Sequence, residues 1–192
     1  MKQLHECISE NIQIIKDDLS EIISKFQFRD LKKGEYLLMS GNKCREMAFI
    51  ESGYLRMFDL ADGKEITLWI GSNSSFITSL SSFVFETPNY WNIQAVTDCK
   101  LLVISRQAHF ELLKRFPKWM EFDNLLLARS FALLEQSMFS QLHTTAQQRY
   151  QVLFEENPAI FNHVPLQHIA SMLGIMPETL SRLRKNLSRP IS

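Results

Sequence analysis

The chain has 192 residues, 45% of them hydrophobic, and its 21 basic and 21 acidic side chains cancel to a formal net charge of zero. That length suits one full domain or two small ones. Because no global field draws the protein toward nucleic acid or membrane, any DNA affinity must come from a local basic patch. Apolar runs are too short to span a bilayer and the N-terminal segment is too charged for a signal peptide, so we expect a cytoplasmic protein without membrane contact.

The first half of the chain changes from a helical to a strand-like pattern. Apolar residues recur every three or four positions between His5 and Phe26, which predicts a helix. From Leu31 to Ser105, short apolar or alternating runs are separated by turn residues, which predicts many short strands in a sandwich or barrel. Asp62-Gly63 lies between two such runs and predicts a hairpin, because both turn positions favour positive φ.

After Ser105 the pattern is helical. A short helix over 107–115 precedes Pro117, which opens a longer helix to about Leu142. Its apolar residues follow a repeat of four and three over three heptads, which is typical of a helix-pairing seam. The seam contains Met120, Leu127, Phe131, Leu134 and Met138. Other apolar residues lie outside it, so the helix packs either on its own domain and a partner chain, or wholly within a monomer core. The residues outside the seam are Leu126, Leu133 and Phe139.

The segment Val164–Asn186 predicts two short helices joined by a tight turn. Gly174 ends the first helix, and Pro177 suits the first turn of the second. The second helix has an apolar stripe made of Leu180, Leu183 and Leu187. Its other sides carry Glu178, Thr179, Ser181, Arg182, Arg184 and Lys185, and Arg189 follows. This is a helix-turn-helix pattern, in which early residues reach base edges and cations pair with phosphates. The alternative is an ordinary glycine-capped helix pair with a solubilising basic end.

The order of β-rich module, long seam helix and helix-turn-helix resembles the Crp-Fnr superfamily of bacterial regulators. Lys32–Glu35 with Gly41, Phe49–Arg56 and Asp62–Glu65 resemble turns and strands of its cyclic-nucleotide-binding-type β-roll, and 76–95 lies where the family has its phosphate-binding cassette. The resemblance implies an α+β fold: an N-terminal helix and antiparallel β-roll (a double-stranded β-helix or jelly roll) over 1–116, a dimerisation helix over 117–143, and a DNA-binding domain over 144–192. It implies a homodimer on double-stranded DNA that contacts RNA polymerase. Glu178, Thr179 and Arg182 stand where base contacts occur, and Gln167 resembles a phosphate contact.

The cassette departs from that of cyclic-AMP-binding members. Ser79 stands at the position of their glutamate, and Asn89 and Tyr90 stand where an arginine and a small hydroxyl residue would be. A buried cyclic phosphate needs a cation or several aimed donors, yet residues 76–91 contain no Lys or Arg. We therefore expect no cyclic AMP binding. A lone Cys7 near the N-terminus cannot hold an iron–sulfur cluster.

Other departures limit what the resemblance carries over. Haem ligation by His5, His109 or His143 is not expected, because isolated histidines are usually surface or core groups. No metal site is expected either. The chain continues too briefly after the second helix for the family's β-hairpin wing, and Pro177 replaces an arginine that reads guanine in some relatives.

The cassette region is aromatic and nearly uncharged. Its candidate effector-pocket residues are Phe76, Ser79, Phe83, Asn89, Tyr90 and Trp91. Either they hold a small apolar or uncharged aromatic effector, or they are ordinary core and the roll is a scaffold. The function expected is a dimeric DNA-binding transcription regulator not controlled by cyclic AMP. The alternative is a small-molecule-binding or interaction protein that has lost DNA binding. Nucleophile-elbow, P-loop and zinc-protease motifs are absent, so an enzyme is not expected.

Overall fold

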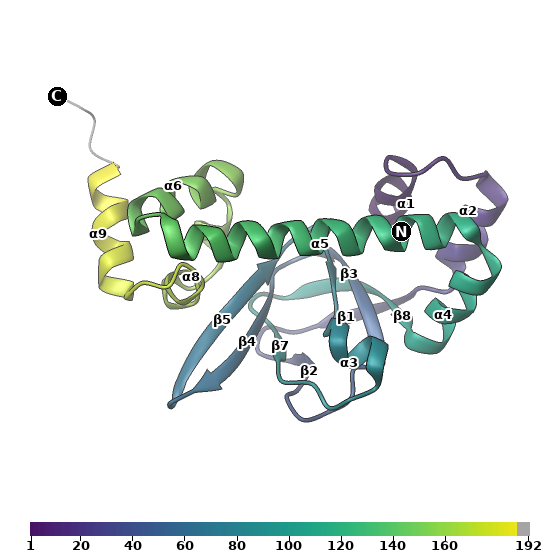
Figure 1. The fold of residues 1–192 in the computed structure, drawn as a ribbon, viewed down its shortest axis with the longest axis horizontal. Coiled ribbons are helices and arrows are strands. Elements are labelled where there is room, and N and C mark those ends of the chain that lie inside the picture. Colours follow the sequence, from purple (N-terminus) through teal and green to yellow (C-terminus); the bar gives the residue numbers. More distant parts are fainter. Residues whose placement is uncertain (188–192) are drawn as a thin grey trace.

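The computed structural model describes residues 1–187, with the side chains of Asn186 and Leu187 outside the description. The expectations for the side chain of Leu187, for Arg189 and for the missing wing therefore lie outside the part of the chain that the structure describes. A long helix, α5 (Pro117–His143), runs the length of the molecule (Figure 1). The β-roll lies beneath its middle, one group of helices lies at each end, and no described helix is long and apolar enough to cross a membrane.

The N-terminal helical segment is two helices, α1 (Lys2–Ser9) and α2 (Lys16–Ser24), so the prediction of one helix over His5–Phe26 was wrong. The Asn11 amide donates to the Cys7 carbonyl at 2.6 Å where α1 ends. The turn that follows lets the apolar faces of α1 and α2 pack into the same core, which one continuous helix over this segment would not allow. The buried residues that share this core are Leu4, Ile8, Ile12, Leu19 and Ile22.

The predicted strands form two antiparallel four-stranded sheets. The first has the order β1 (Gln27–Leu31), β8 (Cys99–Ser105), β3 (Glu46–Ser52) and β6 (Phe76–Ile77). The second has the order β2 (Tyr36–Leu38), β7 (Asn92–Ala95), β4 (Leu55–Ala61) and β5 (Lys64–Gly71). The hairpin between β4 and β5 is confirmed, with φ of 51° at Asp62 and 73° at Gly63. Strands β1 and β6 were not predicted.

Two hydrophobic cores stabilise the roll and the helices packed on it. Inside the roll, side chains such as Ile50, Leu55 and Ile93 pack between the sheets. A second cluster joins the first sheet to α1, α2, α4 (Arg106–Arg115) and the start of α5, whose Trp119 and Phe122 are fully buried. A short helix, α3 (Leu80–Phe85), interrupts the cassette and was not predicted.

The C-terminal helices follow α5 closely. Thr145 caps α6 (Ala146–Glu156), as predicted, in a capping box with Gln148. The helices α7 (Ile160–His163), α8 (Leu166–Met172) and α9 (Pro177–Leu187) complete this part, and α7 was not predicted. Their shared core also includes Ile70 and Val96 of the roll.

Candidate nucleic-acid interface

Helices α8 and α9 form the predicted helix-turn-helix geometry. Gly174 has φ +66°, its N–H donates to the Ser171 carbonyl at 3.0 Å, and the Ile175 N–H donates to the Ala170 carbonyl at 3.0 Å. These bonds close the C-terminus of α8 and turn the chain toward α9. Ile169 and Ala170 are fully buried, so a small residue lies where the helices approach each other.

Helix α9 has one face in the core and one face toward solvent. Leu180 is fully buried and Leu183 packs beside it. Exposed side chains on the opposite face are those of Glu178, Arg182 and Lys185, flanked by the partly exposed Thr179 and Ser181. The Arg182 guanidinium lies 3.5 Å from the Thr179 hydroxyl, one turn earlier. Five of the predicted contact residues therefore share a surface that can enter a major groove.

Arg184 and Gln167 lie outside that surface. Arg184 is half-buried on the flank of α9, with its guanidinium carbon 6.0 Å from the centre of the Phe161 ring. Burial raises the pKa of Tyr150, and the positive charge of Arg184 partly opposes that rise. Gln167 is exposed in the first turn of α8. The phosphate contacts predicted for both residues stay predictions.

The helix-turn-helix is tied to the end of α5 by side chains that bond α8 carbonyls. The Gln141 amide donates to the Met172 carbonyl at 3.2 Å. Arg149 donates from Nε to the Leu173 carbonyl at 2.9 Å and from Nη1 to the Thr144 carbonyl at 2.6 Å. Orphan carbonyls at a helix end are satisfied in this way, so α8 is fixed to the helix that would carry a partner.

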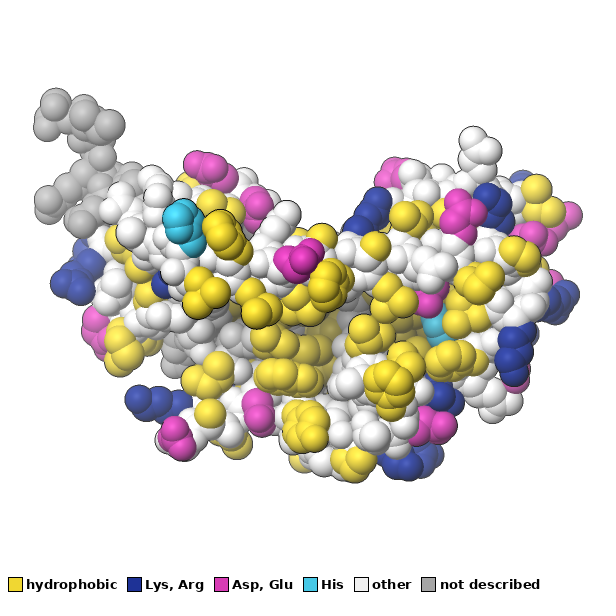
Figure 2. All heavy atoms as spheres, in the orientation of Figure 1, with side chains coloured by type: hydrophobic (Ala, Val, Ile, Leu, Met, Phe, Trp, Pro, Cys, Tyr) yellow, Lys and Arg dark blue, Asp and Glu magenta, His cyan; other side chains and the backbone are white. Residues whose placement is uncertain are grey.

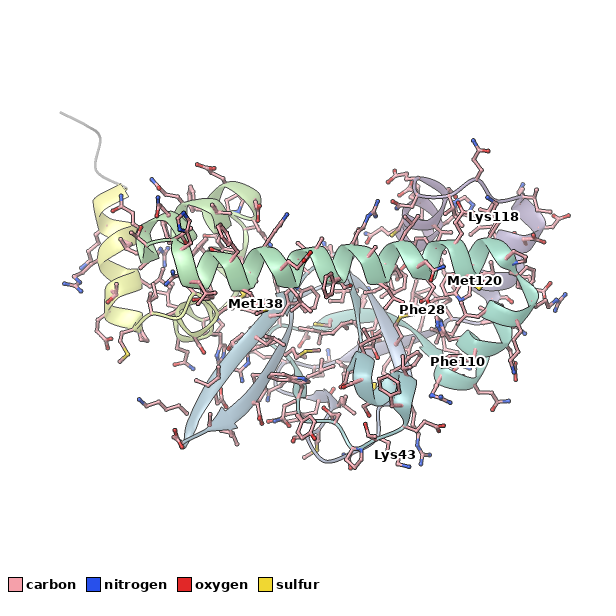
Figure 3. All side chains as sticks on the ribbon, viewed as in Figure 1. Phe28, Lys43, Phe110, Lys118, Met120 and Met138 are labelled. Atoms are coloured by element: carbon pink, nitrogen blue, oxygen red, sulfur yellow. The ribbon has the colours of Figure 1, made fainter. Side chains whose placement is uncertain are left out.

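The seam predicted on α5 is open to solvent in the single chain. Met120, Leu127, Phe131, Leu134 and Met138 are 48%, 38%, 63%, 50% and 66% exposed. Met120 and Met138 mark the two ends of this α5 seam (Figure 3), and hydrophobic side chains lie along much of α5 and on the roll beneath it (Figure 2). Outside the seam, Leu133 and Phe139 are also exposed, whereas Leu126 packs on the helical core.

The six candidate effector-pocket residues do not line one cavity. Phe76 and Phe83 pack in the core beneath α4 and α5, whereas Trp91 packs against the interior of the roll. The Asn89 amide donates to the Met39 and Asn42 carbonyls, and its oxygen accepts from the Trp91 N–H. These bonds show a loop-holding role for Asn89.

The remaining two pocket candidates differ sharply in burial. Tyr90 is 74% exposed. Ser79 is 2% exposed, and its hydroxyl has no hydrogen-bond partner among the described residues. A hydroxyl buried in this way is a local feature of the start of α3, and it points to no ligand on its own.

His109 is a core histidine. Its ring meets Phe83, Phe110 and Trp119, and burial lowers its pKa to about 4. Its Nε2 lies 3.6 Å from the carboxylate of Asp123, whose pKa is raised by burial. A neutral, enclosed imidazole of this kind contributes to packing between α4 and α5.

Comparison with known proteins agrees with this architecture. Residues 28–116 match the family described as cyclic nucleotide-binding domain. A curated relative, the anaerobic regulatory protein of Bacillus subtilis (strain 168), is 28% identical over 116 residues, which cover 56% of this chain and 49% of the relative. The chain thus spans about half the length of the curated relative it matches.

Two solved structures show the same fold. The FixK2 structure from Bradyrhizobium japonicum has a TM-score of 0.74 at 16% identity, covering 84% of each chain. A putative transcriptional regulator of the crp/fnr family from Eubacterium rectale has a TM-score of 0.68 at 20% identity, covering 91% of this chain and 83% of its own. The molecule is a cyclic-nucleotide-binding-type β-roll joined by a long helix to a helix-turn-helix. Residues 28–116 thus match the cyclic nucleotide-binding domain family, and the chain as a whole has the fold of these two solved structures.

Proposed function

We propose that the chain is a homodimeric transcription regulator that binds double-stranded DNA through α9 and is not controlled by cyclic AMP. The observation that carries this proposal is the division of α9 into a buried leucine face and an exposed face with Arg182 and Lys185. A helix anchored on one side and polar on the other fits the major groove, where arginine recognises guanine O6 and N7.

The exposed α5 seam supports the dimer. Five apolar side chains repeat at heptad spacing along one line of a 27-residue helix. All five are exposed in the single chain, whereas Trp119 of the same helix is fully buried. Pairing two such helices buries both seams and brings two recognition helices onto one face of the duplex, with half-sites one helical turn apart.

The proposal is tested by selecting bound sequences from random duplexes and then measuring affinity at several salt concentrations. Arg182→Ala is expected to weaken binding to the selected operator by about 1–3 kcal/mol and to relax one base position, whereas Lys185→Ala weakens all sequences and lowers the salt slope by about 1. Equal losses for Arg182→Ala on selected and random DNA would contradict its base contact. If the wild-type protein enriches no sequence at low salt, the regulator proposal fails and a binding protein without DNA affinity remains.

A further inference from the structure

The outer face of the second sheet is docked onto α8, and polar atoms bridge the two. The Thr67 N–H on β5 donates to the Ser171 hydroxyl at 2.9 Å, and that hydroxyl donates to the Glu65 carbonyl at 3.1 Å. Beside them Ile70 packs among the apolar residues of the helix-turn-helix core. We call this contact between the β4–β5 hairpin and α8 the joint.

Arg56 lies at the centre of the joint. Successive strand residues point to opposite faces, so Leu55 and Met57 fill the roll while Arg56 and Phe58 face α8. Arg56 is only 1% exposed, and its guanidinium carbon lies 3.7 Å from the centre of the Phe58 ring. Its Nη1 donates to the Glu65 carboxylate at 2.7 Å. Within the roll, the buried cation is thus held by the Glu65 carboxylate and the Phe58 ring, with the Gln94 amide oxygen 3.5 Å from its Nη2.

The same Nη1 contacts the helix-turn-helix through His168. The distance from Arg56 Nη1 to His168 Nδ1 is 2.5 Å, and because guanidinium nitrogens only donate, Nδ1 must accept and the imidazole is neutral. Burial, with the charge of Arg56, lowers the pKa of His168 to about 4, although Glu65 opposes this. One guanidinium therefore joins a hairpin of the roll to the helix that precedes the recognition helix.

Arg56 cannot itself reach DNA, because it is buried between the roll and α8. Its effect must pass through α8, which is followed after a tight turn by α9. Any rotation of α8 on the hairpin therefore carries α9 with it. In a dimer, such a rotation changes the separation of the two recognition helices, and half-site spacing is set by that separation.

We propose that Arg56 is a positioning residue for DNA recognition, which holds α8 on the β4–β5 hairpin and thereby fixes the half-site spacing that the dimer accepts. This inference rests on the proposed function. The apolar contacts of the joint stay when Arg56 is changed, so its loss frees the orientation of the helix-turn-helix without unfolding it.

The test compares Arg56→Met with a matched control, Arg29→Met. Arg29 also pairs with a glutamate of the roll, Glu46, but it is exposed and lies on β1 in the other sheet. Affinity is measured for the selected operator and for versions with one or two base pairs inserted or removed between the half-sites. We expect wild type and Arg29→Met to discriminate against wrong spacings by about tenfold or more, and Arg56→Met by less than about threefold, with affinity for a single half-site unchanged.

A second readout does not depend on DNA. Hydrogen exchange of the Thr67 amide reports the joint directly, because that N–H bonds across it to Ser171. We expect faster exchange in Arg56→Met and wild-type exchange in Arg29→Met, with both variants cooperatively folded. Should Arg56→Met not fold, Ser171→Ala removes two bonds of the joint from the α8 side and is expected to relax spacing in the same way.

Two outcomes separate the two proposals. Wild-type spacing discrimination in a folded Arg56→Met variant, or in Ser171→Ala if Arg56→Met does not fold, overturns the positioning role. If the wild-type protein selects no DNA, the proposed function fails and the positioning role fails with it. That holds even if faster Thr67 exchange in Arg56→Met shows that the joint has opened.

Discussion

Replacing Met138 with aspartate perturbs the α5 seam at an exposed point. The methionine is 66% exposed in the single chain, and burying a whole side chain of this size is worth about 1.5–3 kcal/mol, so covering the exposed part contributes about 1–2 kcal/mol. A twofold interface contains the position twice, so the apolar loss alone is about 2–4 kcal/mol. Two carboxylates facing each other without partners add several kcal/mol more.

We therefore expect the dissociation constant of the Met138→Asp dimer to rise by about a thousandfold or more, since each 1.4 kcal/mol is tenfold. Sedimentation velocity over a wide range of concentrations measures this directly. Gln136→Asp is the matched control, because Gln136 is exposed on the opposite side of α5 and receives the same new charge. If Met138→Asp sediments as a dimer wherever Gln136→Asp does, the seam is not the interface.

Further predictions concern backbone strain, pH and ligand. Gly174→Ala places a Cβ 2.8 Å from the Gln141 amide oxygen at φ +66°, whereas Gly63→Ala meets nothing within 4 Å at φ +73°. Both substitutions should lower the free energy of unfolding by about 1–2 kcal/mol, because a residue with a Cβ is disfavoured in the left-handed conformation. Only Gly174→Ala should also weaken operator binding. His109 has a folded pKa of about 4, below its ordinary 6.5, so the folded state binds fewer protons. The stability that the neutral imidazole contributes is complete above pH 6.5 and is lost as pH falls toward 4. The free energy of unfolding measured with urea should therefore fall more between pH 6.5 and 4 for wild type than for His109→Gln. Parallel curves for the two proteins would contradict this. Titration calorimetry with cyclic AMP should give no binding at micromolar ligand, and a saturable isotherm would refute the interpretation of the cassette.

Local patterns predicted much of this fold because the forces concerned act over a few residues. Gly174, Pro177 and Thr145 mark helix ends through backbone geometry and capping, and each acts where expected. The N-terminal prediction failed because the three-to-four periodicity continues through a turn that only tertiary packing reveals. Likewise α3 and α7, of six and four residues, are too short to show a period.

The joint was beyond sequence reasoning because its partners are far apart in the chain. Arg56 and His168 are separated by 112 positions, and nothing local links them. One signal was present: Arg56 is a charged residue between apolar neighbours in a strand, so it is expected on the outer face of the sheet and needs polar partners wherever that face is buried. Three of the effector-pocket candidates, Ser79, Asn89 and Tyr90, were assigned from their positions in the family's cassette, whereas their surroundings in the fold depend on local contacts such as the hydrogen bonds of Asn89.

The exposed hydrophobic line on α5 has a consequence for the abundance of the protein in a cell. In the proposed dimer, a newly made copy that has not yet paired would present this hydrophobic surface to chaperones and proteases, so its lifetime would depend on how quickly it meets a second copy. Because only folded chains would pair, mass action would make the melting temperature of the proposed dimer rise with protein concentration. At low concentrations, unpaired copies would then be degraded rather than accumulate as monomers.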